Sequence, residues 1–162
     1  MIERCQCPPQ AGAATCDTDA RRAAPCPACS RDGKPVETVT LKALLAVPLT
    51  ELRPTEYRFC RTPECPVVYY SEDGQQRLPE VALREVVHQK HPSDDDVFVC
   101  YCFRHTPRGI KKELIDTGES VVFASITAGI QAGQCACELR NPQGSCCLGN
   151  VRAVLHRDEG AQ

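Results

Sequence analysis

The sequence has no tryptophan, and aromatic residues make up only 5% of its 162 residues. A large aromatic core is therefore excluded. Metal ions are a plausible substitute for the missing burial, because the free energy of metal binding becomes free energy of folding.

Strong charge and long hydrophobic runs are also lacking. With 19 basic and 21 acidic residues the net charge is −2, which gives no indication of nucleic-acid or membrane-surface binding. The longest apolar stretches, such as residues 44–49, are far too short to cross a bilayer, and the first residues lack the apolar segment of a signal peptide. We therefore expect a cytoplasmic protein with reduced thiols.

Cysteine is what the sequence has in excess. There are 13 cysteines, an odd number that fits poorly with a closed disulfide framework. Without a secretion signal, their density favours metal binding over a disulfide scaffold. Three of them lie in residues 1–24, which are rich in Pro and Ala and are expected to form a flexible leader: Cys5, Cys7 and Cys16.

The first group of cysteines consists of two pairs, Cys26-Pro-Ala-Cys29 and Cys60-(four residues)-Cys65. The runs 57–60 and 67–70 flank the second pair and predict a hairpin, with Tyr69 and Tyr70 packed against the site. Four thiolates with no open position indicate a structural zinc site, although iron would suit the same ligands. Unliganded cysteines or a redox Cys-x-x-Cys are the alternatives, and the latter would need a βαβ unit that is missing here.

The second group holds six cysteines: Cys100, Cys102, Cys135, Cys137, Cys146 and Cys147. A Cys-x-Cys followed by a distant cysteine- and glycine-rich loop suits a 2Fe–2S cluster, which needs four thiolates. Cys100 and Cys102 are the first choice. Cys147 begins the last helix, where the helix dipole favours an anionic ligand, and Cys135 and Cys146 are treated as spare.

The remaining patterns predict an α+β fold, in which a small β-rich zinc-binding lobe (25–92) is followed by a helical 2Fe–2S-binding lobe (97–157). We expect short β-runs at 38–41 and 97–99, the start of a helical turn at 41–45 and a polar linker within 91–96. Helices are expected from Thr106 to Gly118, from Ser120 to Gly133, and over 147–156. The buried stripe of the first of these helices is expected to comprise Ile110, Leu114 and Ile115.

The stretch Val99-Cys-Tyr-Cys-Phe103, two helices, and then Asn141-Pro-Gln-Gly-Ser-Cys-Cys147 resembles the N-terminal domain of CopZ-type copper chaperones. The resemblance covers residues 25–156. It implies one zinc and one 2Fe–2S cluster, with the cluster half similar to bacterioferritin-associated ferredoxin. The implied zinc ligands are Cys26, Cys29, Cys60 and Cys65. The implied cluster ligands are Cys100, Cys102, Cys137 and Cys147.

That family carries copper on a separate C-terminal domain, which the sequence up to Gln162 does not contain. The expected function is therefore one-electron transfer linked to copper handling, in which Cu(II) is reduced to Cu(I) for a copper-carrying protein or a copper ATPase. No enzymatic site stands out, and the electron donor is not indicated. The alternatives are a non-redox double-zinc module for protein contacts and a ferredoxin-like regulator of iron storage.

Overall fold

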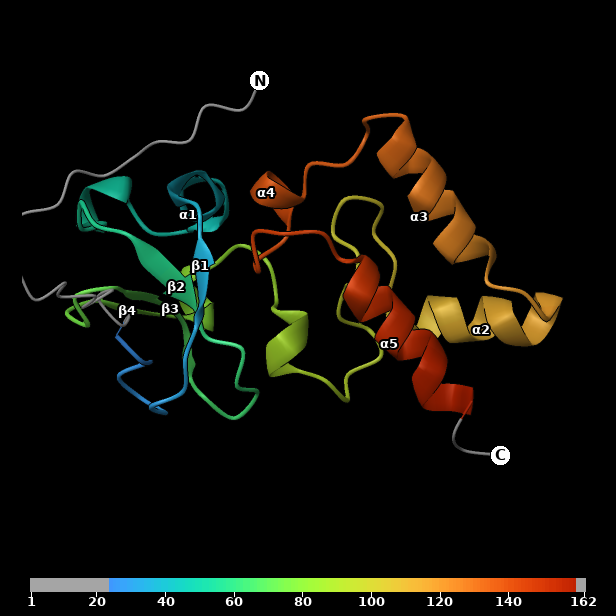
Figure 1. Ribbon diagram of the computed structural model, residues 1–162, viewed down its shortest axis with the longest axis horizontal. Helices are drawn as coiled ribbons and strands as arrows, with labels where there is room; N and C mark the ends of the chain where they lie inside the picture. Colours follow the sequence, from blue (N-terminus) through green and yellow to red (C-terminus); the bar gives the residue numbers. More distant parts are fainter. Residues whose placement is uncertain (1–23, 160–162) are drawn as a thin grey trace, which may run out of the picture.

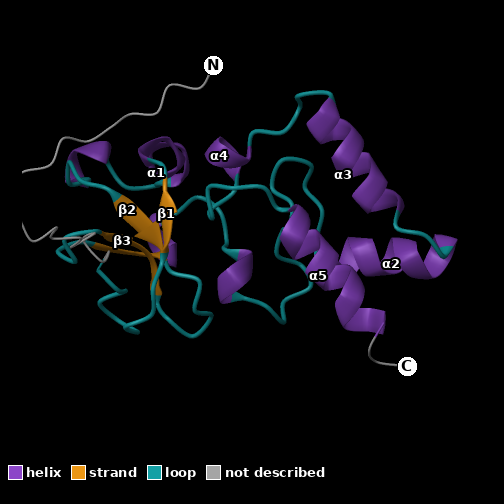
Figure 2. Cartoon of the chain, in the orientation of Figure 1, coloured by secondary structure: helices purple, strands orange, loops and turns teal. Residues whose placement is uncertain are grey.

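A computed structural model describes residues 24–159, so the predicted leader lies outside the described residues except for Ala24. Figures 1 and 2 show strands gathered at one end of the molecule and most helices at the other. We call residues 24–92 the sheet lobe and residues 97–159 the helical lobe. The predicted α+β class is confirmed. Within residues 24–159, no helix is long and apolar enough to cross a membrane.

The sheet is an antiparallel meander of four strands in sequence order. Val67 to Ser71 are buried without exception, so the third strand is covered on both faces. Phe59 pairs with Tyr69 in the register of the second and third strands, which confirms the hairpin predicted around the second cysteine pair. The strands are β1 (Lys34–Val36), β2 (Tyr57–Phe59), β3 (Val67–Ser71) and β4 (Arg77–Pro79).

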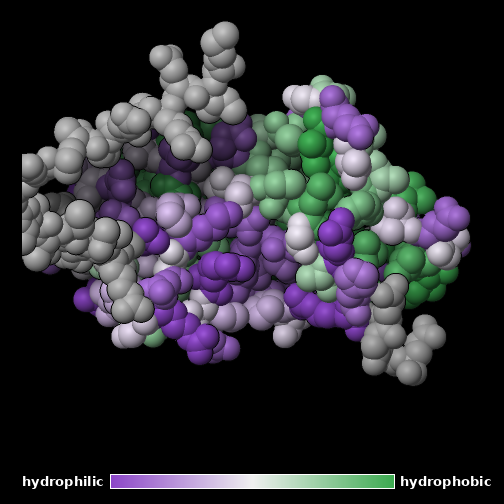
Figure 3. Space-filling view, in the orientation of Figure 1, coloured by the Kyte–Doolittle hydropathy of each residue, from purple (hydrophilic) through white to green (hydrophobic). Residues whose placement is uncertain are grey.

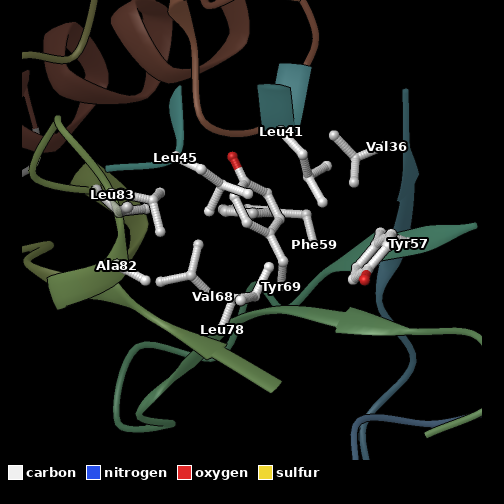
Figure 4. Packing of buried hydrophobic residues seen from close by; sticks show 11 residues of the cluster. Val36, Leu41, Leu45, Tyr57, Phe59, Val68, Tyr69, Leu78, Ala82 and Leu83 are labelled. Atoms are coloured by element: carbon white, nitrogen blue, oxygen red, sulfur yellow. The ribbon is translucent and has the colours of Figure 1, made fainter. Parts of the chain in front are cut away.

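Helix α1 (Thr38–Leu44) covers the sheet, and the β-run predicted at 38–41 is wrong. Its buried residues, Thr40, Leu41 and Leu44, share the spacing of one helix face. Burial of that face against the sheet outweighs the β-preference of the threonines and valine. Figure 4 shows Leu41 packed with Phe59 and Tyr69 in the core of the sheet lobe.

Short 3₁₀ turns complete the sheet lobe: η1 (Leu49–Glu51), η2 (Glu80–Ala82) and η3 (His88–Lys90). The segment that follows is held on the helical lobe, because Asp95 and Asp96 pair with Lys111 and Arg108. The strand predicted at 97–99 is absent. Instead, the N–H groups of Val99 and Cys100 donate to the carbonyl of His105, so the chain folds back on itself in a tight loop, and no strand of residues 24–159 pairs with it.

The helical lobe contains α2 (Pro107–Thr117), α3 (Val121–Gln131), α4 (Cys137–Arg140) and α5 (Leu148–Glu159). Thr106 caps α2 as predicted, since its Oγ1 accepts from the Gly109 N–H at 3.2 Å. Gly118 ends this helix with a left-handed φ of 72°. The predicted buried stripe is wrong at Ile115, which is 82% exposed. Five residues carry it about 140° around the helix from Ile110, which is buried.

Candidate metal centres

The first thiol group lies at one corner of the sheet lobe. A tight turn carries Cys26 and Cys29, and it is closed by a hydrogen bond from the Ser30 N–H to the Cys26 carbonyl. Cys60 directly follows β2 and Cys65 precedes β3, so the β2–β3 connection brings the second pair to the same corner. The structure thus brings together four residues that the sequence analysis proposed as zinc ligands: Cys26, Cys29, Cys60 and Cys65.

The sulfur atoms of this group have the spacing of a tetrahedral site. Cys26 Sγ lies 3.8 Å from Cys65 Sγ, and Cys29 Sγ lies 3.6 Å from Cys60 Sγ. All four sulfurs are within 4.8 Å of one another. A tetrahedron with Zn–S bonds of about 2.3 Å has S–S edges of about 3.8 Å. The geometry therefore fits one four-coordinate ion with no open position.

The thiols of this first group differ in how readily they ionise. Burial raises the pKa of the Cys65 thiol to about 12 and also raises that of Cys26. Burial opposes ionisation of Cys29 as well, but the Thr62 hydroxyl, 3.5 Å from its sulfur, and the backbone at Arg31 hold its pKa at about 6. A bound cation would offset the burial of the remaining thiolates. Thr62 was not singled out from the sequence, although it lies in the loop between the second pair.

The two neighbouring tyrosines of β3 behave differently. Tyr70 packs against the first thiol group as predicted, and its hydroxyl accepts the Gly33 N–H at 2.8 Å. Tyr69 does not contact that group. Successive side chains of a strand point to opposite faces, so Tyr69 enters the hydrophobic core instead.

A second thiol group lies in the core of the helical lobe. Cys102 Sγ is 3.7 Å from Cys137 Sγ, and Cys100, Cys137 and Cys147 are buried in the same hydrophobic cluster. The four cysteines of this second group come from three segments. Cys100 and Cys102 lie in the loop before α2, Cys137 is the first residue of α4, and Cys147 directly precedes α5.

This second group is more spread out than the first. In the described part of the chain, only the first group has three or more potential ligand atoms all within 4.8 Å of one another. A binuclear cluster distributes its thiolates over two irons and needs this wider arrangement. The Ala136 N–H donates to Cys102 Sγ at 3.3 Å, the kind of backbone contact that tunes cluster ligands. The donor set and its apolar surroundings therefore fit a 2Fe–2S cluster.

Ionisation in this second group follows its hydrogen bonds. Donation from Cys147 lowers the pKa of Cys137 to about 6 and that of Cys100 to about 7. For the same reason the pKa of Cys147, as the donor, is raised. Burial raises the pKa of Cys102 to about 11.

The other two cysteines of the helical lobe are more accessible. Cys146 is exposed and Cys135 is half-buried, and neither belongs to the hydrophobic cluster that surrounds the second thiol group. Figure 3 shows apolar side chains on the surface of the helical lobe, whereas the middle of the molecule is mostly polar.

Residues 23–94 match the model of the CopZ zinc-binding domain family. Copper chaperone CopZ of Archaeoglobus fulgidus is 30% identical over 123 residues, which cover 75% of this chain and 57% of that relative. The chain thus spans little more than half the length of the relative. The crystal structure of the Archaeoglobus fulgidus CopZ N-terminal domain matches with a TM-score of 0.67 and 27% identity, over 80% of this chain and 96% of that one.

The family match and the structural match cover different lengths of the chain. The family model ends near the start of the helical lobe, whereas the structural match covers nearly all of the solved domain. The four-cysteine corner thus lies in a segment with the sequence of a zinc-binding domain, and 80% of the chain shares the fold of the solved domain. Sequence and structure agree that the chain contains a domain of the CopZ N-terminal type.

Proposed function

We propose that this chain is a non-enzymatic zinc and iron–sulfur protein of copper handling. In this proposal the first thiol group holds zinc and the second holds a 2Fe–2S cluster. The protein passes single electrons and reduces Cu(II) to Cu(I) for a copper-carrying protein or a copper ATPase. Reduced thiols are required at both groups, which favours a cytoplasmic location.

One observation carries the redox part of the proposal: four buried or half-buried thiols converge in the helical lobe without forming a single-ion site. Cys102 and Cys137 make one close pair at 3.7 Å, and Cys100, Cys137 and Cys147 are buried in one cluster. When bound, a 2Fe–2S cluster supplies one electron per turnover at a potential set by hydrogen bonds and burial. Cysteines of the chain supply the ligands, a backbone N–H donates a hydrogen bond to sulfur, and the surrounding side chains keep the site apolar.

Copper enters the proposal through the relative, whose name states that it is a copper chaperone. Cu(II) gains one electron and becomes Cu(I), while the reduced protein loses one. Thiolate ligands hold Cu(I) much better than Cu(II), so a thiol-bearing partner would draw the product away. The electron returns to the protein from a one-electron donor, for which dithionite stands in below.

The first experiment measures zinc, iron and acid-labile sulfide in anaerobically purified protein, with electron paramagnetic resonance after dithionite reduction. We expect zinc, equal amounts of iron and sulfide, and a paramagnetic signal on reduction. A colourless protein with zinc in both thiol groups and no sulfide would instead establish the double-zinc module.

The second experiment tests copper. Reduced, desalted protein is mixed with Cu(II) and a chelator specific for Cu(I), and the yield is compared with that of Cys147→Ala. We expect about one Cu(I) per reduced chain from the parent protein and little from the variant. Free thiols also reduce copper, so a Cys135→Ala/Cys146→Ala double variant serves as the matched control and should retain the full yield. Equal yields from the parent and Cys147→Ala would remove copper reduction from the proposal.

A further inference from the structure

A buried tyrosine hydroxyl of the sheet lobe reaches into the helical lobe. Tyr69 is fully buried in β3, and its Oη donates to the carbonyl oxygen of Pro142 at 2.6 Å. Figure 4 shows its side chain extending from the strand through the core. Pro142 belongs to the loop 141–147 that ends in Cys147, a member of the second thiol group. The sheet therefore holds the backbone of this loop.

The hydroxyl of Tyr101 connects the lobes in the opposite direction, from the helical lobe to the sheet lobe. Tyr101 lies between two cysteines of the second thiol group and is 2% exposed. Its Oη donates to the Val86 carbonyl at 2.8 Å and accepts the His88 N–H at 2.9 Å. Both bonds join it to the last part of the sheet lobe.

The loop 141–147 makes further contacts with the sheet lobe. Lys34, the first residue of β1, donates from Nζ to Ser145 Oγ at 2.7 Å. Gly144 lies so close to β1 and α1 that a Cβ there would be 2.8 Å from Val36 Cγ2 and 3.1 Å from Thr40 Oγ1. Helix α4, which precedes the loop, packs against α1, as Figure 1 shows. The sheet lobe therefore forms the surface on which this ligand-bearing loop is seated.

Strand β3 connects the two thiol groups through adjacent residues. The Tyr70 ring packs on the first thiol group and its hydroxyl accepts from Gly33, while Tyr69 on the opposite face binds Pro142. Strand β3 therefore lies between the two sites: one face contacts the first thiol group and the other contacts the loop 141–147.

We infer that Tyr69 and Tyr101 are positioning residues of the proposed 2Fe–2S site: they fix its two ligand-bearing loops to the sheet lobe. This inference rests on the proposed function for its choice of cofactor. The Tyr69 hydroxyl binds the backbone of the loop 141–147, and the Tyr101 hydroxyl binds the sheet-lobe backbone at Val86 and His88, so both act through backbone groups. Replacing either by Phe preserves the ring and removes only the hydroxyl, which leaves the Pro142 carbonyl, or Val86 and His88, without this partner. A buried polar group that loses its partner costs about 1–3 kcal/mol.

The test compares four single variants: Tyr69→Phe, Tyr101→Phe, Tyr57→Phe and Tyr70→Phe. Tyr57 is a matched control, because its buried hydroxyl bonds within the sheet lobe, to Arg53. The rate of iron loss under excess EDTA should rise about fivefold or more in Tyr69→Phe and Tyr101→Phe. Their reduced paramagnetic signals should also broaden or shift, which a general loss of stability would not cause. Tyr57→Phe and Tyr70→Phe should match the parent rate of iron loss and its signal.

Equal iron loss in all four variants, or parent-like loss in Tyr69→Phe and Tyr101→Phe, would overturn the inference. A second measurement does not depend on iron. Amide hydrogen exchange of the protein as purified should show reduced protection of residues 143–147 in Tyr69→Phe and of residues 99–103 in Tyr101→Phe, but in neither segment for Tyr57→Phe. If the parent protein contains no iron, the proposed cofactor fails. The positioning role is then decided by this exchange pattern alone, and unchanged protection would refute it.

Discussion

The Phe103 ring occupies the space that a side chain at Gly129 would need. A Cβ built on Gly129 would collide with Cζ of the ring and lie 2.8 Å from Cε1. Gly129 is buried in the last turn of α3, and Phe103 directly follows a cysteine of the second thiol group. The absence of a side chain at one position thus lets α3 rest on the loop that carries Cys100 and Cys102.

Gly129→Ala should destabilise the protein by about 1–3 kcal/mol, since the extra methyl overpacks this contact. Gly109→Ala is the control: its nearest neighbour is Thr106 Oγ1 at 3.4 Å, an ordinary contact. At that helical position Ala should be neutral or stabilise by up to about 1 kcal/mol. Chemical denaturation of both variants measures the difference, and equal stabilities would contradict the packing argument.

Gly144→Ala should destabilise the protein more than Gly133→Ala does. Both glycines have left-handed backbones, with φ of 65° and 67°, so each substitution carries about 1–2 kcal/mol of strain. Only Gly144 also faces neighbours, Val36 and Thr40, whereas nothing lies within 4 Å of a Cβ at Gly133. Thermal unfolding of the two variants separates strain from packing. A Gly133→Ala variant as unstable as Gly144→Ala would show that the contact with β1 and α1 contributes nothing.

Cys137→Ala should lose iron, while Cys135→Ala should keep it. Cys137 is buried beside Cys102, and Cys135 lies two residues earlier with its side chain half-buried outside that group. The visible absorption of anaerobically prepared variants reports the outcome. A bleached Cys135→Ala protein beside an intact Cys137→Ala protein would reverse the assignment of this pair.

Removal of metal from the first thiol group should loosen the sheet lobe. Three of its four thiols are buried, and the Cys65 pKa of about 12 reflects how strongly burial opposes its charge without a cation. Cys65→Ser should therefore lose zinc and become more sensitive to protease within residues 24–92. Cys146→Ser, altered at an exposed thiol, is the control. A zinc-replete and equally resistant Cys65→Ser protein would show that the site is not structural.

The free energy of unfolding should decrease on acidification because the buried His88 side chain becomes protonated. Burial, together with the nearby charge of Arg157, lowers the pKa of this side chain below its ordinary value of 6.5. The unfolded chain therefore binds a proton more readily than the folded one. The stabilisation that comes from neutral His88 is present above pH 6.5, and it is lost as the pH falls through 6.5 towards the folded-state pKa. Between pH 7.5 and 6.0, His88→Gln should lose less free energy of unfolding than the parent, measured by denaturant titration. Equal losses would exclude His88 as the source.

Local patterns predicted the parts of the structure that depend on neighbours in sequence. The apolar runs on either side of Cys60 and Cys65 predicted their hairpin, and Thr106 and Gly118 marked the ends of α2. Residues 38–41 were misread as a strand because their β-branched side chains carry a preference that packing on the sheet overrides. The sequence of Val97 to Val99 likewise suits a strand, but none of the strands in the described part of the chain pairs with it.

Contacts between distant segments had no local signal. Tyr69 and Pro142 are separated by most of the helical lobe, and nothing about either residue alone indicates that they meet. The grouping of Cys100 and Cys102 with Cys137 was proposed from a family resemblance, not from spacing. Spacing within the chain predicts which thiols share a turn, whereas the fold decides which turns come together.

The order of residues along the chain has a consequence for synthesis. The first thiol group is complete once Cys65 has been translated, whereas the second needs Cys147, near the end of the described chain. Domains tend to fold from the N-terminus during translation. We therefore expect the sheet lobe to acquire its metal while the helical lobe is still emerging from the ribosome. The loop 141–147 is made after β1 and α1, on which it packs, so a ribosome stalled before that loop would hold a chain with a complete first thiol group and without Cys147 of the second.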